Sequence, residues 1–279
     1  MIVPFLWMVS TSLKNPGAVF STQRNFLGQL IPSPIIWGNY PKAWTIIDFP
    51  RYYFNTTFVT CMITFGQVVT SSMAAFSFAR LSFPGRDKIF FAYLATMMIP
   101  FYVTMIPIFI IFKILSNISD QLMPAGIYIL NHNFGKLIGL DSYFALIVPG
   151  MFTAYGTFML RQYFMGLPTD LEEAAKIDGS SFWGIYWRIT LPLSKPALAT
   201  LTVLTFMGSW KDFLWPLIVI SSDEMKTIAV GLSSFQGLYT TEWTLLMAGS
   251  VIMLIPMILV FLFNQKFFVE GIKLTGIKG

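Results

Sequence analysis

Residues 167–196 read LPTDLEEAAKIDGSSFWGIYWRITLPLSKP, the longest polar insert that lies directly between two strongly apolar runs. The stretch predicts two short helices joined by a turn. Thr169 and Asp170 can each cap the first helix, with Glu172 and Glu173 three residues later as the second half of a capping box. Carboxylates in this first turn also stabilise the positive N-terminal end of a helix.

Gly179 is expected to end the first helix, because glycine adopts the left-handed conformation that closes many helices. Ser180 or Ser181 then starts a second helix, which Leu191-Pro192 is expected to stop. A hairpin of this size between two membrane spans is too short to be a domain. We interpret it as a projection that fits a cleft in another protein. The alternative is an ordinary amphipathic hairpin at the membrane surface.

The same stretch carries a family resemblance. EEAAKIDGSS followed by ITLPLSKPAL resembles the EAA loop of permease subunits in binding-protein-dependent ABC importers, and it is similar to the maltose-type permease G relatives of the carbohydrate-uptake branch. The resemblance implies that residues 166–195 form a cytoplasmic coupling loop that docks into a groove of an ATP-hydrolysing subunit. The residues implied in this contact are Glu172, Glu173, Ala174, Ala175, Asp178, Gly179, Ile189, Leu191 and Pro192.

The composition places the chain in a membrane. Of its 279 residues, 55% are hydrophobic and only 11% are charged, and the mean hydropathy is +0.67. Soluble domains carry about 25% charged residues. The net charge of +5 is therefore better explained by cytoplasmic flanks of membrane spans than by nucleic-acid binding.

Five apolar runs are each long enough to cross a bilayer as a helix, which requires about 20 residues. The runs are residues 54–79, 89–112, 142–160, 196–220 and 243–265. Residues 1–9 are apolar but too short, and we interpret them as the remnant of a first span, through truncation or a misassigned start. With the resemblance, the runs predict an all-α integral membrane protein: a six-span type I ABC importer permease bundle with a truncated first span and a cytoplasmic coupling helix.

The distribution of basic residues predicts the orientation of the spans. Residues 80–88, 161–195 and 265–279 hold ten Lys and Arg in 59 residues, whereas residues 10–52, 113–142 and 221–242 hold seven in 95. Because cytoplasmic loops are enriched in Lys and Arg, the first set is cytoplasmic. The chain accordingly divides into residues 1–52 (span remnant and outer loop), residues 53–265 (transmembrane permease domain) and residues 266–279 (cytoplasmic tail).

Polar residues at helical spacing suggest where a solute passes. In lipid, polar side chains tend to face a bundle interior or a cavity. Three stripes have this spacing: Thr60, Thr64, Gln67 and Ser71; Thr202, Thr205, Ser209, Asp212 and Pro216; and Gly150, Thr153 and Thr157. Each stripe could equally be a helix-packing surface. The candidate pathway residues are Gln67, Ser71, Tyr155, Ser209, Trp210 and Asp212.

Asp212 is the strongest of these candidates. A charge at the bilayer centre costs about 2.5–3.5 kcal/mol on insertion scales, so it is retained mainly for a function. Lys211 and Asp212 are the only charges within the five runs. Consecutive helical residues do not face each other, so the two are not expected to form a salt bridge.

The resemblance extends to the end of the chain and implies partners. The tail FFVEGIKLTGIKG, residues 267–279, resembles a segment that lies against the ATPase subunits, which implicates Gly271, Gly276, Lys278 and Gly279. The outer loop 221–242 corresponds to one that reaches towards the binding protein. The implied assembly, in the inner (plasma) membrane of a prokaryote, contains a second, different permease subunit, two ATP-binding subunits, an extracytoplasmic solute-binding protein and surrounding lipid.

No catalytic or metal motif is recognisable. Gly135-Lys136 is followed by Leu137, and Leu130 stands where a phosphate-binding loop needs glycine. We expect no catalytic residue, metal or bound cofactor in this chain, so that ATP and Mg belong to the partner subunits. Cys61 is interpreted as a small packing residue and His132 as a loop histidine.

Several functions remain open from sequence alone. The first is import of an oligosaccharide or related sugar or polyol. Alternatives are an ABC importer for a glycerol phosphate ester or other non-sugar solute, and a channel that uses the hairpin as a regulatory docking site. A membrane-embedded enzyme is disfavoured, because no intramembrane pair has acid–base or metal-binding spacing. Residues 113–141 form a long outer loop that could contact the solute-delivering protein or be a tolerated insertion.

Overall fold

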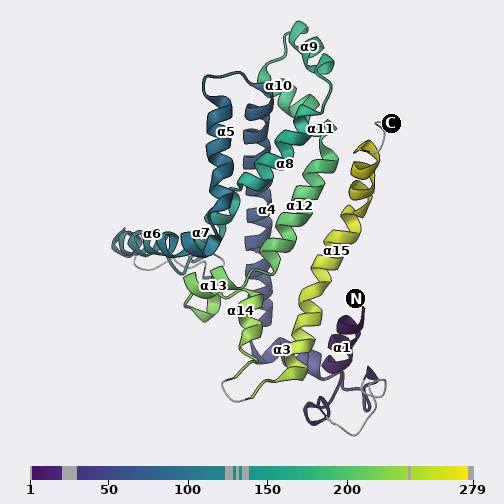
Figure 1. The fold of residues 1–279 in the computed structure, drawn as a ribbon. Coiled ribbons are helices and arrows are strands. Elements are labelled where there is room, and N and C mark those ends of the chain that lie inside the picture. Colours follow the sequence, from purple (N-terminus) through teal and green to yellow (C-terminus); the bar gives the residue numbers. More distant parts are fainter. Residues whose placement is uncertain are drawn as a thin grey trace.

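The computed structural model describes residues 2–20, 30–122, 128–129, 132–133, 138–237 and 240–275. Helices dominate this part of the chain (Figure 1). The elements, in chain order, are α1 (Val3–Ser12), η1 (Pro16–Ala18), α3 (Asn39–Ile46), α4 (Phe49–Arg80), α5 (Arg86–Ala95), η2 (Thr96–Met98), α6 (Phe101–Leu122), β1 (Tyr128–Ile129), β2 (His132–Asn133), α7 (Tyr143–Ile147), η3 (Val148–Met151), α8 (Ala154–Met165), α9 (Asp170–Ile177), α10 (Phe182–Ile185), η4 (Tyr186–Thr190), α11 (Leu191–Leu193), α12 (Lys195–Trp210), α13 (Leu214–Val219), η5 (Asp223–Met225), α14 (Ile228–Ser233) and α15 (Trp243–Thr275).

The centre of the bundle is α4, a continuous helix of 32 residues. It packs against α8 and α12, and α12 in turn packs against α15, which α1 and α3 cover near one end (Figure 1). In the described part of the chain, four segments are long and apolar enough to cross a membrane, and a bent pair of helices, residues 182–193 and 195–210, could supply a fifth. The expected all-α membrane bundle is therefore confirmed.

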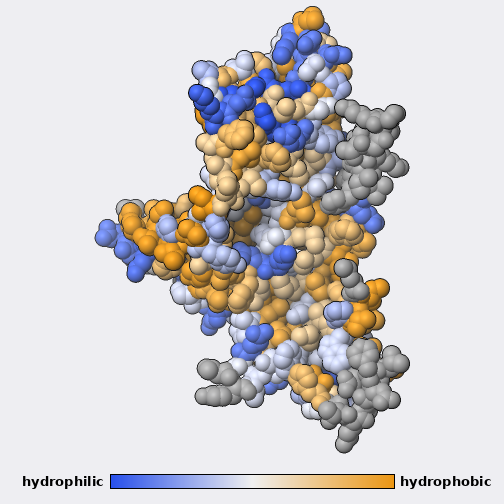
Figure 2. Space-filling model, in the orientation of Figure 1, coloured by the Kyte–Doolittle hydropathy of each residue, from blue (hydrophilic) through white to orange (hydrophobic). Residues whose placement is uncertain are grey.

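The segments that were predicted to share one side of the membrane lie at the same end of the bundle. The α4–α5 turn, the hairpin from α9 to α11 and the C-terminal end of α15 all lie at one end (Figure 1). The end of α1, α3, α14 and the loop before α15 lie at the other. Hydrophilic surface gathers at the end that carries α9, whereas apolar surface covers much of the middle (Figure 2).

The predicted span 89–112 is wrong as a single helix. The chain runs along α4 as α5 and η2, breaks at Ile99 and Pro100, and then leaves the bundle sideways as α6 (Figure 1). Ile99 is extended, with φ −84° and ψ 115°, as expected of a residue that precedes proline. The loop expected at residues 113–141 also begins later, because α6 continues to Leu122.

Two further spans are interrupted. In the run 142–160, helical structure stops after η3, and Phe152 and Thr153 are extended before α8 begins. In the run 196–220, α12 ends at Trp210 and α13 begins at Leu214, so Lys211 and Asp212 lie in a break and not within a helix. Non-helical backbone at membrane depth is tolerated where it lines a cavity or is buried in protein.

The structure also places two single residues that the sequence analysis interpreted. Cys61 is exposed on α4, so it does not pack against the described part of this chain as expected. His132 lies opposite Ile129 in the short antiparallel pair of β1 and β2, within the predicted outer loop.

Candidate functional site

The hairpin at residues 167–196 begins with α9, and Gly179 ends this helix as predicted. Gly179 has φ +79°, in the left-handed region. The N–H of Ser180 donates to the carbonyl oxygen of Ala175 at 2.8 Å, and the N–H of Gly179 donates to that of Lys176 at 3.0 Å. This pair of bonds defines a Schellman motif, which satisfies carbonyl groups that a helix end leaves without partners.

The second half of the hairpin starts at Ser181, whose Oγ accepts a hydrogen bond from the N–H of Gly184 at 3.2 Å. The expectation that Leu191-Pro192 stops this helix is wrong. Pro192 occupies the first turn of α11, where its missing N–H costs nothing. The bend comes instead at Ser194, between two segments inclined by 77°.

The predicted capping box does not form at Thr169. Its side chain makes no capping hydrogen bond, and its backbone is already helical, with φ −72° and ψ −27°. Glu172, the expected partner, turns towards α4 instead. Its Oε1 lies 2.7 Å from Nε of Arg80. An ion pair with a guanidinium therefore replaces the local cap.

The remaining residues implied in ATPase coupling divide by exposure. Glu173, Ala174, Asp178, Gly179 and Pro192 are exposed, whereas Ala175, Ile189 and Leu191 are half-buried. The sequence reasoning missed six large apolar side chains of the hairpin that are also exposed: Leu171 (47%), Ile177 (86%), Phe182 (56%), Trp183 (60%), Trp187 (59%) and Leu193 (41%). The helix α9 at the tip of this hairpin extends beyond the ends of α4 and α5 (Figure 1). Exposed acidic and apolar side chains on such a projection are suited to docking on another surface.

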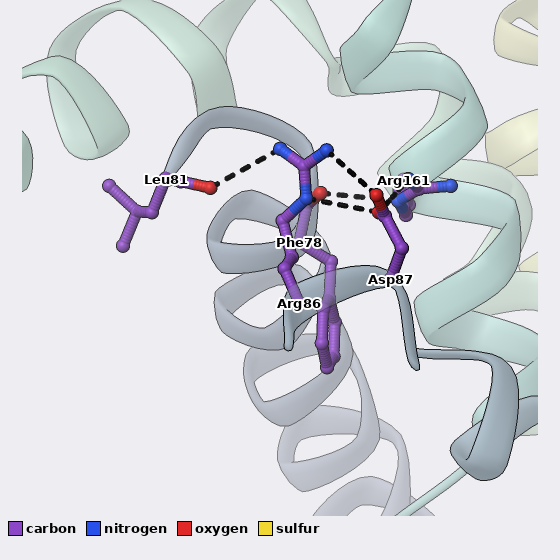
Figure 3. Close-up of polar contacts among 5 residues, drawn as sticks. All are labelled: Phe78, Leu81, Arg86, Asp87 and Arg161. Atoms are coloured by element: carbon purple, nitrogen blue, oxygen red, sulfur yellow. Dashed lines mark hydrogen bonds and ion pairs between the residues drawn. The ribbon is translucent and has the colours of Figure 1, made fainter. Parts of the chain in front are cut away.

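A polar cluster fixes the neighbouring α4–α5 turn to α8 (Figure 3). Nε of Arg161 donates to the carbonyl oxygen of Phe78 at 3.2 Å, and its Nη2 lies 3.6 Å from Oδ1 of Asp87. Arg86 donates to Oδ1 of Asp87 at 3.1 Å and to the carbonyl of Leu81. The hydrogen bond from Arg86 lowers the pKa of Asp87, so this carboxylate is ionised at neutral pH.

A cavity of about 590 Å³ lies between α4, α8, α12 and the helix breaks beside them. Figure 2 shows a hollow at the base of the α6 projection, where hydrophilic and apolar surfaces meet. The polar residues that line the cavity are Gln67, Thr153, Tyr155, Thr205, Ser209 and Asp212. The Asp212 carboxylate faces the backbone N–H groups that begin α13.

Four of the six candidate pathway residues, Gln67, Tyr155, Ser209 and Asp212, are thus brought together, and the other two are not. Trp210 is 1% exposed, donates from Nε1 to the carbonyl of Met253 at 2.9 Å and stacks on Phe206. Ser71 is also 1% exposed and lies against Gly156, where a Cβ would come within 2.6 Å of its Oγ. These placements favour a packing role for both.

The sequence stripes did not identify the aromatic walls of the cavity. Phe101, Phe152 and Trp215 line it from the three places where the chain breaks or bends. Nε1 of Trp215 donates to the carbonyl of Ala145 at 2.9 Å, which orients the ring. A search for helical periodicity along the expected runs does not find such residues, because they lie in or directly beside breaks that interrupt the helices predicted for those runs.

The predicted tail contact is described only in part. Gly271 lies within α15, whereas Gly276, Lys278 and Gly279 fall outside the described residues. Leu130 and Gly135 to Leu137, from the sequence that lacks a phosphate-binding loop, also fall outside them.

The outer loops 113–141 and 221–242 are joined by hydrogen bonds. Oδ1 of Asp141 accepts hydrogen bonds from the N–H groups of Ser221 and Ser222 at 3.1 Å and 3.0 Å.

Residues 67–274 match the family described as "Binding-protein-dependent transport system inner membrane component". The chain is 36% identical to the arabinooligosaccharides transport system permease protein AraQ of Bacillus subtilis (strain 168), over 82% of this chain and 74% of that protein. It is 34% identical to the sn-glycerol-3-phosphate transport system permease protein UgpE of Yersinia enterocolitica, over 87% and 82%. The crystal structure of a bacterial ABC transporter involved in the import of the acidic polysaccharide alginate contains a similar fold, with a TM-score of 0.78 and 24% identity over 96% of this chain and 90% of that chain.

Proposed function

Because the chain belongs to the family of inner-membrane components of binding-protein-dependent transport systems, we propose that it is a permease subunit of an ATP-driven importer that moves a carbohydrate into the cytoplasm. The protein is a multi-pass membrane protein. The observation that carries the proposal is the hairpin α9–α11, which projects from the end of a bundle that contains a polar cavity.

The hairpin supplies the coupling. Its exposed acidic residues Glu173 and Asp178 and its exposed apolar residues Phe182 and Trp183 offer charge and apolar area to an ATP-hydrolysing partner subunit. Movement of that subunit displaces α9, and the bundle follows, exchanging outward for inward access. The helix breaks at Pro100, Thr153 and Lys211 provide places where such a bundle can bend.

The lining of the cavity favours a neutral saccharide over an anionic solute. Amide and hydroxyl groups from Gln67, Thr153 and Ser209 suit sugar hydroxyls, and the ring of Tyr155, which is 46% exposed, suits a sugar face. Asp212 is the only charged residue among the described residues of this lining. A phosphate ester would therefore meet a carboxylate without a compensating cation. Import of a glycerol phosphate ester remains the alternative, as in the relative UgpE.

The lateral helix α6 supports the proposal of a second permease subunit. It leaves Phe101, Tyr102, Val103, Ile106, Ile110, Ile111, Ile114 and Ile118 exposed. In lipid, helix association depends on close packing and not on removal of apolar surface from water. A different permease subunit at this face would form the heterodimer, with a solute-binding protein at the end opposite α9.

The test is uptake into proteoliposomes that contain this chain, its partner permease and the ATPase subunits. We expect accumulation of a labelled neutral oligosaccharide that requires both ATP and the binding protein, with little uptake of glycerol 3-phosphate. Equilibration without ATP would instead indicate a channel. Preferential accumulation of glycerol 3-phosphate would retain the permease assignment and overturn the solute class.

A further inference from the structure

One member of the acidic cluster in α9 does not face outward. Glu172 is only 6% exposed, and it is the one buried carboxylate among the residues that the structure describes. Its neighbours Asp170 and Glu173 are exposed. A docking contact with another subunit requires an accessible side chain. The environment of Glu172 therefore indicates a role inside this chain.

The partner of Glu172 is Arg80, the last residue of α4. Nε of Arg80 and Oε1 of Glu172 are 2.7 Å apart, with the two side chains 9% and 8% exposed. These two atoms are within ion-pair distance, but the Nε–H of Arg80 is not aligned with the oxygen as a hydrogen bond requires. Nη2 of Arg80 also donates to the carbonyl oxygen of Leu167 at 2.9 Å. One guanidinium thus holds the hairpin both at its entry and in the first turn of α9.

The middle of α4 lines the cavity. Gln67 and Ile63 line the cavity and belong to the same uninterrupted helix as Arg80. The 13 residues from Gln67 to Arg80 correspond to about 20 Å of helix at 1.5 Å per residue. Gly66 packs so closely on Met151 that a Cβ would come within 2.4 Å of its side chain. Displacement of the α4 end is therefore transmitted to the cavity wall.

The second half of the hairpin is connected to α4 by different contacts. The hydroxyls of Tyr186 and Ser72 share a hydrogen bond of 2.8 Å, and Phe76 packs on the Tyr186 ring. These contacts hold the second half of the hairpin, whereas Arg80 holds α9 itself. Loss of one partner of a buried ion pair leaves an uncompensated charge, so the Arg80–Glu172 contact resists separation.

We propose that the Arg80–Glu172 pair is the joint through which movement of α9 is transmitted to α4 and from there to the cavity wall. This inference rests on the proposed function, because it assigns the internal step between the partner ATPase and the solute pathway. Both residues are positioning residues: neither touches solute or nucleotide. The joint stays closed through the transport cycle, so α9 and the end of α4 move as one unit.

The first test measures solute imported per ATP hydrolysed in reconstituted transporter. Glu172→Gln removes the charge and keeps the shape, and Asp170→Asn removes an exposed charge from the same helix turn as the matched control. We expect Glu172→Gln to capture the ATPase subunits and hydrolyse ATP near the wild-type rate while the transport ratio falls about tenfold, within the range of allosteric coupling energies. Asp170→Asn retains the wild-type ratio.

The alternatives give different results. If Glu172 contacted the ATPase, capture and hydrolysis would fall together with transport. If the pair only stabilised the fold, the amount of assembled transporter would fall and the ratio per ATP would not. If Glu172→Gln fails to assemble, the double variant Arg80→Gln/Glu172→Gln is used, because it removes both charges and leaves no unpaired buried charge. A wild-type ratio of solute imported per ATP in that double variant overturns the joint.

The second test replaces the ion pair by a removable covalent link. Arg80→Cys/Glu172→Cys, in a Cys61→Ala background because Cys61 is exposed, is bridged with a short bifunctional methanethiosulfonate reagent. We expect bridging to restore the transport ratio and reduction to lower it again. Loss of transport on bridging, or no change in either direction, overturns the closed joint. Failure of wild-type protein to capture an ATPase subunit would instead overturn the proposed function, and the joint with it.

Discussion

The phenolic oxygen of Tyr143 donates a 2.6 Å hydrogen bond to Oδ1 of Asn55, joining the start of α7 to α4 across 88 positions in the chain. The same Asn55 donates from Nδ2 to the carbonyl oxygens of Glu224 and Lys226, each at 2.8 Å. Asn55 is 0% exposed. One buried amide therefore ties α4, α7 and the outer loop together at the end of the bundle opposite the hairpin.

Tyr143→Phe should destabilise the protein, because it leaves the buried Oδ1 of Asn55 without this donor. An unsatisfied buried acceptor costs about 1–3 kcal/mol. The change is measured as a lower Tm in detergent. Tyr102→Phe removes a hydroxyl from an exposed residue of α6 and serves as the control. Equal Tm values for the two variants would contradict the role assigned to this bond.

Gly179→Ala should weaken binding of the ATPase subunit, because a side chain at φ +79° strains the end of α9. The left-handed conformation costs a non-glycine residue about 1–2 kcal/mol. No atom lies near the position of the added Cβ, so the effect comes from the backbone alone. Gly184→Ala, in the helical second half of the same hairpin, is the control. The two variants are compared by the amount of ATPase subunit that each captures in a pulldown. Equal capture would contradict a role of the Schellman motif at Gly179 in binding the ATPase subunit.

Asp212→Asn should reduce uptake of a neutral saccharide about tenfold, the effect of losing roughly 1.4 kcal/mol from one charged hydrogen bond. Asparagine keeps the size of the side chain and one of its oxygen acceptors, so we expect the fold to be retained. Lys211→Gln removes the neighbouring charge, which lies outside the cavity lining, and is the control. The initial rates of saccharide uptake into proteoliposomes are compared between Asp212→Asn, Lys211→Gln and the wild type. An unchanged rate in Asp212→Asn would remove this residue from the pathway.

The cluster around Asp87 predicts a pH dependence of stability. Arg86 lowers the pKa of Asp87 below its ordinary value of 3.8, so the folded state favours the ionised carboxylate. The contribution is therefore complete above the unfolded pKa and is lost as the pH falls through the lower folded pKa. The Tm difference between wild type and Asp87→Asn should stay constant from about pH 7 to pH 5 and shrink only in stronger acid. Loss of the difference near pH 6 would contradict this assignment.

Much of the site was predictable from local chemistry. Gly179 ends α9 as expected, since the left-handed requirement depends only on neighbouring backbone. Gln67 and Ser209 reach the cavity because they lie on regular helices, where spacing determines direction. Trp210 and Ser71 have equally suitable spacing but are packed inside. Spacing alone does not show which neighbouring helix covers a given face.

The sequence by itself determined the membrane class, the helical hairpin and which segments share an end of the bundle, because these follow from composition, turn chemistry and the distribution of Lys and Arg. Only the tertiary structure decided where the spans break and which acidic residue of α9 turns inward. The sideways course of α6 after Pro100 and the pairing of Glu172 with Arg80 depend on contacts between segments far apart in the chain. Such contacts select among conformations that the local sequence permits about equally.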